Sequence, residues 1–174
     1  MKKLFAALVI IGFFSCKKEN SADTNYHVSF AVNGVTKTYT GHVLAHADTT
    51  SGYVEFTILG TNTMTSTDDY LGIYLNNDPG GSNIASGQYQ DAATNYTLLT
   101  TYENSGKEYE AGQSVAEDGA TYNTTIANHF KVIITSMDKN TTRGTFSGDY
   151  YENGDVRSGT KISITNGEFY VPVQ

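Results

Sequence analysis

The sequence predicts an all-β protein, and three observations support this fold class. Of its 174 residues, 24 are Thr and 13 are Tyr, which suit a pleated, half-buried surface better than a helix. Short runs of alternating apolar and polar residues recur along the chain, separated by turn-forming residues. After the first sixteen residues, no apolar spacing of helical period continues beyond two turns. A chain of this length is expected to form one domain.

The chain opens with the residue order of a secretory signal. Lys2 and Lys3 precede an almost unbroken apolar run over residues 4–14, and Ser15 and Cys16 follow it. In helical form this run reaches about 16 Å, well short of the ~30 Å hydrocarbon core of a bilayer. We therefore expect a cleaved signal rather than a permanent membrane span. Because Cys16 is the only cysteine, a disulfide within the chain is impossible.

Residues 13–16, Phe-Phe-Ser-Cys, resemble the lipobox of bacterial lipoproteins, with Phe13 where the common pattern has Leu. The resemblance implies that the signal peptide 1–15 is removed. It also implies that Cys16 is the lipid attachment site, diacylated through its sulfur with fatty acids such as palmitate and usually acylated on its amino group. Two chains anchor a protein stably, whereas one binds a bilayer only marginally. The alternative is a secretory signal without lipidation.

The residues after Cys16 are polar and without periodicity, so we expect an acylated cysteine and flexible tether over residues 16–25. The order Cys16-Lys17-Lys18-Glu19 resembles lipoproteins of Bacteroidota. In lipoproteins of enteric bacteria, Asp directly after the cysteine is linked to retention in the inner membrane, and position 17 is not Asp. The resemblance therefore implies a lipid anchor in the cell outer membrane, and the periplasmic and surface faces both stay open.

The charge of the mature chain excludes some partners. Without Lys2 and Lys3, 9 basic residues face 18 acidic ones, which gives a net charge of −9. Such a body is repelled by anionic lipid surfaces, so the acyl chains must supply the membrane contact. No basic cluster stands out beyond the N-terminus, and nucleic acid is therefore not expected as a partner.

Residues 26–174 are predicted to form a single antiparallel β-sandwich, with a closed, lipocalin-like β-barrel as the alternative. The first strand places Val28, Phe30 and Val32 on one face, and Asn33-Gly34 after it is the strongest short hairpin signal. Turns are also expected at 153–154 and 166–167, and residues 111–127 are predicted to form a long mobile loop. The predicted strands cover residues 27–32, 35–40, 42–47, 53–59, 70–75, 96–102, 107–111, 129–136, 142–151, 161–165 and 168–173.

A second resemblance lies near the C-terminus. The segments VIITSMD at 132–138, GTFSG at 144–148 and ITNGEF at 164–169 resemble the end of an uncharacterised Bacteroidota lipoprotein domain. The match covers about a quarter of the chain and consists of strand and hairpin residues. It implies an anchored β domain and carries no chemistry to transfer.

The histidines do not form a metal-binding pattern. His42 and His46 have the spacing of a zinc helix, but the Glu of a metalloprotease motif is missing. On a strand the two rings would lie about 13 Å apart, too far to share a zinc ion. His27 and His129 are lone strand histidines, for which surface or cross-strand packing is expected. No metal and no cofactor is predicted.

Two further segments favour a structural interpretation. Ser147 suggests a serine nucleophile, but Gly144 lies three residues before it and Gly148 one after, which does not fit a nucleophile elbow. The run 76–81, Asn-Asn-Asp-Pro-Gly-Gly, is a turn sequence that lacks the helix or lysine of a phosphate cradle.

Acidic residues are the group with the most chemical promise, because calcium binds carboxylate and carbonyl oxygens on loops. The alternation of Asp138, Asn140 and Thr142 has a faint calcium-loop character, although Arg143 and Asp149 occupy the positions that need Gly and Glu. The other acidic candidates are Asp68, Asp69, Glu103, Glu108, Glu110, Glu117 and Asp118.

Tyrosines alternate along several predicted strands. They could form a sugar or peptide platform, because Tyr offers an apolar face and a hydroxyl, but cross-strand packing is the favoured interpretation. The absence of Trp weakens the carbohydrate case. The residues concerned are Tyr70, Tyr74, Tyr96, Tyr102, Tyr109, Tyr150 and Tyr151.

We therefore expect an outer-membrane-anchored envelope lipoprotein that acts as a non-enzymatic binding or accessory module. Its ligand-binding residues cannot be named from the sequence, and an envelope protein or a glycan is a possible partner. A carrier of a lipid or small hydrophobic ligand, built as a β-barrel, is the alternative. An enzyme ranks third, because no nucleophile is paired with a base and no catalytic residue can be assigned.

Overall fold

The computed structural model describes residues 25–48, 55–63, 69–77, 84–91, 95–118, 121–122, 126–157 and 159–174. The predicted signal peptide, the lipid attachment site Cys16 and the tether up to residue 24 lie outside these ranges. Within them, no helix has the length and apolar character needed to cross a membrane.

The described part of the chain is built almost entirely from strands, together with one short helix, α1 (Gln113–Ala116). The all-β prediction is therefore confirmed. The strands are β1 (His27–Val32), β2 (Val35–Tyr39), β3 (His42–Asp48), β4 (Glu55–Thr61), β5 (Asp69–Asn77), β6 (Gly87–Gln90), β7 (Tyr96–Asn104), β8 (Lys107–Gly112), β9 (Glu117–Asp118), β10 (Thr121–Tyr122), β11 (Lys131–Met137), β12 (Thr141–Glu152) and β13 (Lys161–Pro172).

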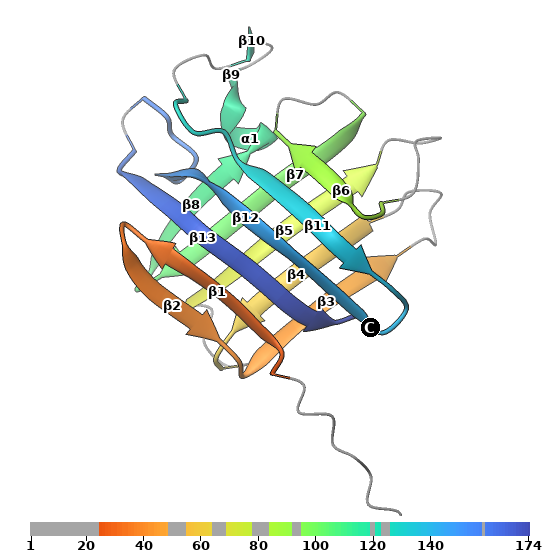
Figure 1. The fold of residues 1–174 in the computed structure, drawn as a ribbon. Coiled ribbons are helices and arrows are strands. Elements are labelled where there is room, and N and C mark those ends of the chain that lie inside the picture. Colours follow the sequence, from red (N-terminus) through yellow and green to blue (C-terminus); the bar gives the residue numbers. More distant parts are fainter. Residues whose placement is uncertain are drawn as a thin grey trace, which may run out of the picture.

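Eleven of these strands form one antiparallel sheet that folds over on itself into two layers (Figure 1). The front layer has the order β2-β1-β13-β12-β11-β6, and the back layer has the order β8-β7-β5-β4-β3. The strands of the two layers cross steeply in Figure 1, as in orthogonal β packing. Strand β12 joins the layers, because β11 pairs with its first half and β8 with Tyr151 and Glu152 near its end.

The sheet nearly closes on its other side, which gives the sandwich a barrel-like shape. Ala45 of β3 forms an isolated parallel bridge with Val173, and the backbone N–H of Gln174 donates to the Ala45 carbonyl at 2.9 Å. Both predicted architectures, sandwich and barrel, thus describe part of the result.

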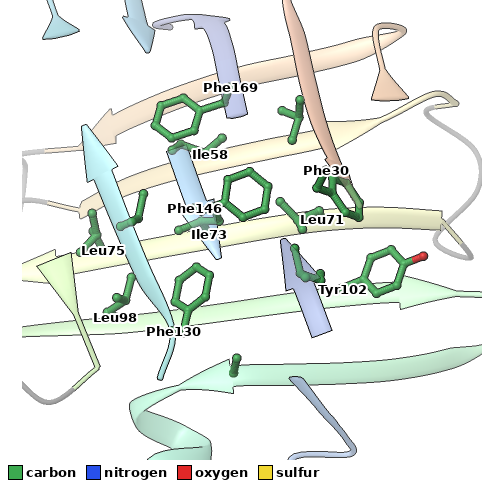
Figure 2. Close-up of a cluster of buried hydrophobic side chains, with 14 of the residues drawn as sticks. Phe30, Ile58, Leu71, Ile73, Leu75, Leu98, Tyr102, Phe130, Phe146 and Phe169 are labelled. Carbon is green, nitrogen blue, oxygen red and sulfur yellow. The ribbon is translucent and has the colours of Figure 1, made fainter. Parts of the chain in front are cut away.

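Side chains from both layers fill the space between them (Figure 2). Phe30 of the front layer packs edge-on against Tyr102 of the back layer, with ring centroids 5.5 Å apart. Its ring is tilted relative to that of Phe146, at 6.0 Å. Tyr150 of β12 reaches across to Thr100 of β7, with their hydroxyl oxygens 2.9 Å apart. Aromatic rings bury a large apolar area each, so these contacts contribute much to the stability.

The predicted turns at Asn33-Gly34 and Asn153-Gly154 are present. All four residues have positive φ, with values of 48°, 86°, 54° and 69°. Asn and Gly tolerate this left-handed region better than other residues, which explains why these dipeptides end strands here.

The predicted turn at Asn166-Gly167 is wrong, because β13 continues as one strand through both residues. Asn166 does adopt a positive φ of 52°, but it lies in a β-bulge. Thr165 and Glu168 pair with Ala31 and Ser29 of β1, so β13 carries one residue more than its neighbour between these pairs. The same backbone preference therefore bends a long strand instead of ending it.

One other prediction is wrong, and one strand was not predicted. The stretch 111–127 was expected to be a long loop, but β8 continues to Gly112, and residues 113–118 and 121–122 form α1, β9 and β10. The sequence did not indicate β6 (Gly87–Gln90), which is short and contains no aliphatic residue.

Candidate functional site

A polar cleft of about 420 Å³ lies on the outer face of the front layer, across β6, β11, β12 and β13. Its lining comes from the alternation of inward and outward side chains along these strands. Phe146 and Tyr150 of β12 point into the core, so Ser147 and Asp149 between them point outward. The lining offers amides, hydroxyls and ionisable groups from Gln88, Gln90, Asn128, His129, Lys131, Ser147, Asp149, Ser163 and Thr165.

Asp149 is the most unusual residue of the cleft, because its carboxylate is buried on a solvent-facing side of the sheet. Its side chain is 1% exposed. Ser163 donates to Oδ1 at 2.6 Å, while Lys161 and Asn128 donate to Oδ2 at 3.1 and 3.2 Å. Burial acts to raise the pKa of Asp149, but the hydrogen bonds from Ser163, Lys161 and Asn128 outweigh it and hold the pKa below the usual range.

A second buried carboxylate positions the histidine of the cleft. Asp91 is 2% exposed, and its Oδ2 accepts the backbone N–H of Phe130 at 3.0 Å. Nδ1 of His129 lies 3.1 Å from Asp91 Oδ1, which fixes the orientation of the ring.

The chain packs tightly beneath the cleft at Gly148. A Cβ atom at this position would lie 2.7 Å from Cα of Phe130, closer than real Cβ contacts allow. The backbone N–H of Asp149 also donates to the carbonyl of Asn128 at 2.9 Å. The segment that carries Asn128 and His129 is therefore held directly against β12.

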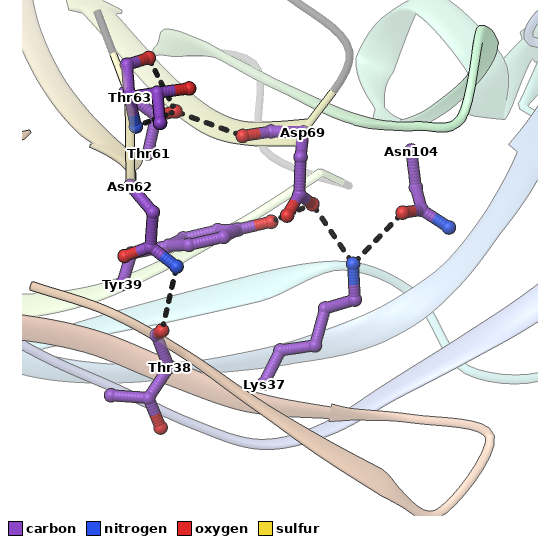
Figure 3. A network of polar contacts seen from close by, with 8 residues as sticks. All are labelled: Lys37, Thr38, Tyr39, Thr61, Asn62, Thr63, Asp69 and Asn104. Atoms are coloured by element: carbon purple, nitrogen blue, oxygen red, sulfur yellow. Dashed lines mark hydrogen bonds and ion pairs between the residues drawn. The ribbon is translucent and has the colours of Figure 1, made fainter. Parts of the chain in front are cut away.

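A different polar cluster closes one end of the sandwich (Figure 3). The ammonium of Lys37 on β2 lies 2.9 Å from Asp69 Oδ1 on β5 and donates to Asn104 Oδ1 on β7 at 2.9 Å. Tyr39 donates to the same Asp69 oxygen at 2.6 Å. Burial and hydrogen bonding to Asp69 raise the pKa of the Tyr39 hydroxyl. We call these four residues the end cluster.

The structure separates most of the acidic candidates. Asp69 belongs to the end cluster, whereas Glu103 and Glu108 are direct cross-strand partners in the β7–β8 hairpin. Asp138 accepts the backbone N–H groups of Asn140 and Thr141 at 2.7 and 2.9 Å, so its spacing reflects a turn between β11 and β12. Asp68 and the side chains of Glu117 and Asp118 lie outside the described residues.

The remaining candidates lie on strands. His42 and His46 are both in β3, and Ser147 is inside β12 rather than at a strand-to-helix turn. Among the described residues, no group of three or more His, Cys, Asp or Glu side chains is placed to hold a metal ion. Of the run 76–81, only Asn76 and Asn77 are described, and both belong to β5.

The favoured packing role of the tyrosines is confirmed for those in the interior. Tyr102, Tyr109, Tyr150 and Tyr151 are all buried. Tyr70 and Tyr96 are half-buried, and Tyr74, on the back layer, is the most exposed of the seven at 40%.

Sequence reasoning missed the cleft, although His129 and Ser147 were considered individually. The available signal was Asp149, a charged residue at an outward position between apolar ones. The alternation of side chains along a strand does not by itself show that an outward residue is buried. Comparison with family models, curated proteins and solved structures finds no significant match for this chain. Function must therefore be inferred from the sequence and the geometry.

Proposed function

We propose that this protein is an outer-membrane-anchored envelope lipoprotein, held by acyl chains on Cys16, that acts as a non-enzymatic binding module. The anchor rests on the lipobox-like residues 13–16 and on the polar residues between Cys16 and β1. At ~3.3 to 3.6 Å per residue, such a tether holds the β domain clear of the lipid headgroups.

The observation that carries the binding role is the buried Asp149 carboxylate at the polar cleft. Burying an ionised carboxylate is costly, and the fold offsets this cost with three side-chain donors. These bonds preset the positions of Ser163 and Asn128, which line the opening. Such a prearranged, hydrogen-bonding surface suits a small polar ligand.

The charge around the cleft favours an acidic group on that ligand. The ammonium of Lys131 has no ion-pair partner among the described residues, whereas Lys161 is paired with Asp149. A carboxylate or phosphate beside Lys131 would gain a charge-assisted hydrogen bond.

The chemistry of the cleft supports a binding rather than a catalytic role. Ser163 donates its hydrogen to Asp149, but a carboxylate with a lowered pKa is a weak base at neutral pH. The filled interior also favours binding at the surface over carriage of a hydrophobic ligand. Phe30 with Tyr102, and Tyr150 with Thr100, make contacts between the layers where a carrier would need open space.

The anchor is tested by metabolic labelling with an alkyne fatty acid in a bacterial host that processes lipoproteins. We expect labelled mature protein in the membrane fraction, and complete loss of label in Cys16→Ala, because the thiol is the acceptor. Ser15→Ala is the control and should keep its label, since Ala is also small. Unlabelled wild type, or label that persists in Cys16→Ala, would reject the anchor.

The binding role is tested by thermal shift of the mature protein with glucose, glucuronate and glucose 1-phosphate as probes. We expect one or both acidic probes to raise the melting temperature more than glucose does, and Lys131→Ala to abolish the difference. Thr135→Ala, also on β11 but outside the cleft lining, is the matched control. Equal shifts in wild type and Lys131→Ala, or no shift with any probe, would contradict the proposed site.

A further inference from the structure

The outer face of the back layer carries an exposed aromatic ring that the polar cleft does not use. Among the described residues, Val35 and Tyr74 are the exposed large hydrophobic side chains, at 69% and 40%. Tyr74 lies near the middle of β5, a central strand of its layer, so paired strands lie on both sides of it.

The ring of Tyr74 lies along its own strand, over Gly72. A Cβ atom at Gly72 would lie 2.8 Å from the Tyr74 hydroxyl oxygen and 2.9 Å from Cε2. The two residues are on the same side of β5, because they are two apart. Any larger residue at position 72 would push the ring off the sheet. The hydroxyl end of the ring thus lies against Gly72, while 40% of the residue is open to solvent.

An open cleft of about 220 Å³ adjoins this ring. The cross-strand partners of Tyr74, Thr57 on β4 and Leu99 on β7, contribute to its lining. The next row of the sheet adds the side chains of Glu55, Asn76 and Thr97. The lining therefore combines an aromatic ring with residues that carry hydroxyl, amide and carboxylate groups.

Asn76 brings an unsatisfied acceptor to this cleft. Its Oδ1 atom is buried and has no hydrogen-bond partner among the described residues, although the residue as a whole is partly exposed. A buried acceptor without a donor costs about 1–3 kcal/mol. The terminal torsion of Asn is soft, so a rotation of the amide can present the oxygen to a ligand hydroxyl.

We propose that this surface, which we call the Tyr74 platform, binds a pyranose ring of a neutral glycan. A pyranose with equatorial hydroxyls has an apolar C–H face that stacks on an aromatic ring. Its rim of hydroxyls matches Thr57 and Thr97 as partners and supplies the donor that Asn76 lacks. Among the described lining residues, the single charged group is Glu55, which accepts hydrogen bonds from hydroxyls and repels anionic ligands.

The test is calorimetric titration of the intact mature protein with cellohexaose, a chain of equatorial glucose units, in a detergent without a sugar headgroup. We expect millimolar to micromolar binding that Tyr74→Ala weakens at least tenfold and Tyr74→Phe weakens less than threefold, because Phe keeps the ring. Gly72→Ala keeps the tyrosine but displaces its ring, so it should weaken binding as well.

Tyr170→Ala is the matched aromatic control, because Tyr170 lies on the front layer with Arg143 stacked on its ring at 3.9 Å. It should bind cellohexaose like wild type. The proposal is overturned by the absence of binding at millimolar cellohexaose, or by wild-type affinity in Tyr74→Ala. Binding that is lost in Lys131→Ala but kept in Tyr74→Ala would also overturn it, since the sugar would then occupy the polar cleft.

Discussion

The end cluster and the polar cleft each contain a lysine paired with an aspartate, yet their surroundings differ. The Lys37–Asp69 pair measures 2.9 Å and the Lys161–Asp149 pair 3.1 Å. The Asp69 side chain is 41% exposed, whereas that of Asp149 is 1% exposed. An exposed ion pair contributes little to folding stability. A buried carboxylate strongly destabilises the folded state when its hydrogen-bond donors are removed. The same two residue types thus hold an edge strand in place in the end cluster and form part of a prearranged site in the polar cleft.

The end cluster holds the edge strand β2 against β5 and β7. Lys37 and Tyr39 point inward from β2, which ends the front layer of the sheet. The side-chain amide of Asn62 accepts from the N–H of Thr40 at 3.1 Å and donates to the carbonyl of Thr38 at 3.3 Å. An inward charge and covered backbone groups both discourage an edge strand from pairing with another chain. The end cluster therefore has a sufficient structural explanation.

The largest expected effect compares alanine at the two aspartates. Asp149→Ala should lower the free energy of unfolding by about 3 kcal/mol, because Ser163 and Asn128 lose a charged acceptor in a buried place. The loss stays at the lower end of the range for buried pairs, since half of the Lys161 side chain reaches water. Asp69→Ala should cost less, about 1–2 kcal/mol, because its pair with Lys37 is exposed and only the buried Tyr39 hydroxyl loses an acceptor. Urea denaturation at neutral pH measures both, and equal losses would remove the distinction between the two clusters.

The next effect is on acid stability. Because the pKa of Asp149 is lowered in the folded protein, its stabilising contribution is complete above the ordinary value of 3.8 and is lost as pH falls through the folded pKa. The stability difference between wild type and Asp149→Asn should therefore shrink as the pH falls below about 4. Denaturation curves recorded between neutral pH and strong acid give this difference. A gap that stays constant with pH would mean that Asp149 is not held ionised.

These contrasts show what the sequence predicts and what it does not. The alternation of apolar and polar residues and the Asn33-Gly34 turn predicted most of the long strands, because both depend on neighbours in the sequence. The bulge at Asn166 and the buried state of Asp149 depend on strands that pair over long distances, so local patterns did not reveal them. The cleft needs β6, β11, β12 and β13 side by side, an arrangement that no single segment encodes.

The smallest expected effect on stability compares two buried tyrosines, one whose hydroxyl is hydrogen-bonded and one whose hydroxyl is not bonded within the described part of the chain. Thr100 donates its one hydroxyl hydrogen to the Gly72 carbonyl at 2.8 Å, so Tyr150 must donate to Thr100. Tyr150→Phe removes this bond and should cost about 1 kcal/mol.

The Tyr102 hydroxyl, at the margin of the core in Figure 2, has no hydrogen-bond partner among the described residues. Tyr102→Phe keeps the ring beneath Lys37, whose ammonium lies 5.4 Å from the ring centroid, and removes the unpaired group. It should leave the free energy of unfolding within about 0.5 kcal/mol of wild type or raise it, because replacing an unsatisfied polar atom carries no loss. Urea denaturation of the two variants side by side measures the contrast. A loss in Tyr102→Phe as large as in Tyr150→Phe would show that the Tyr102 hydroxyl bonds within the end cluster, which would make that cluster as tightly built as the cleft.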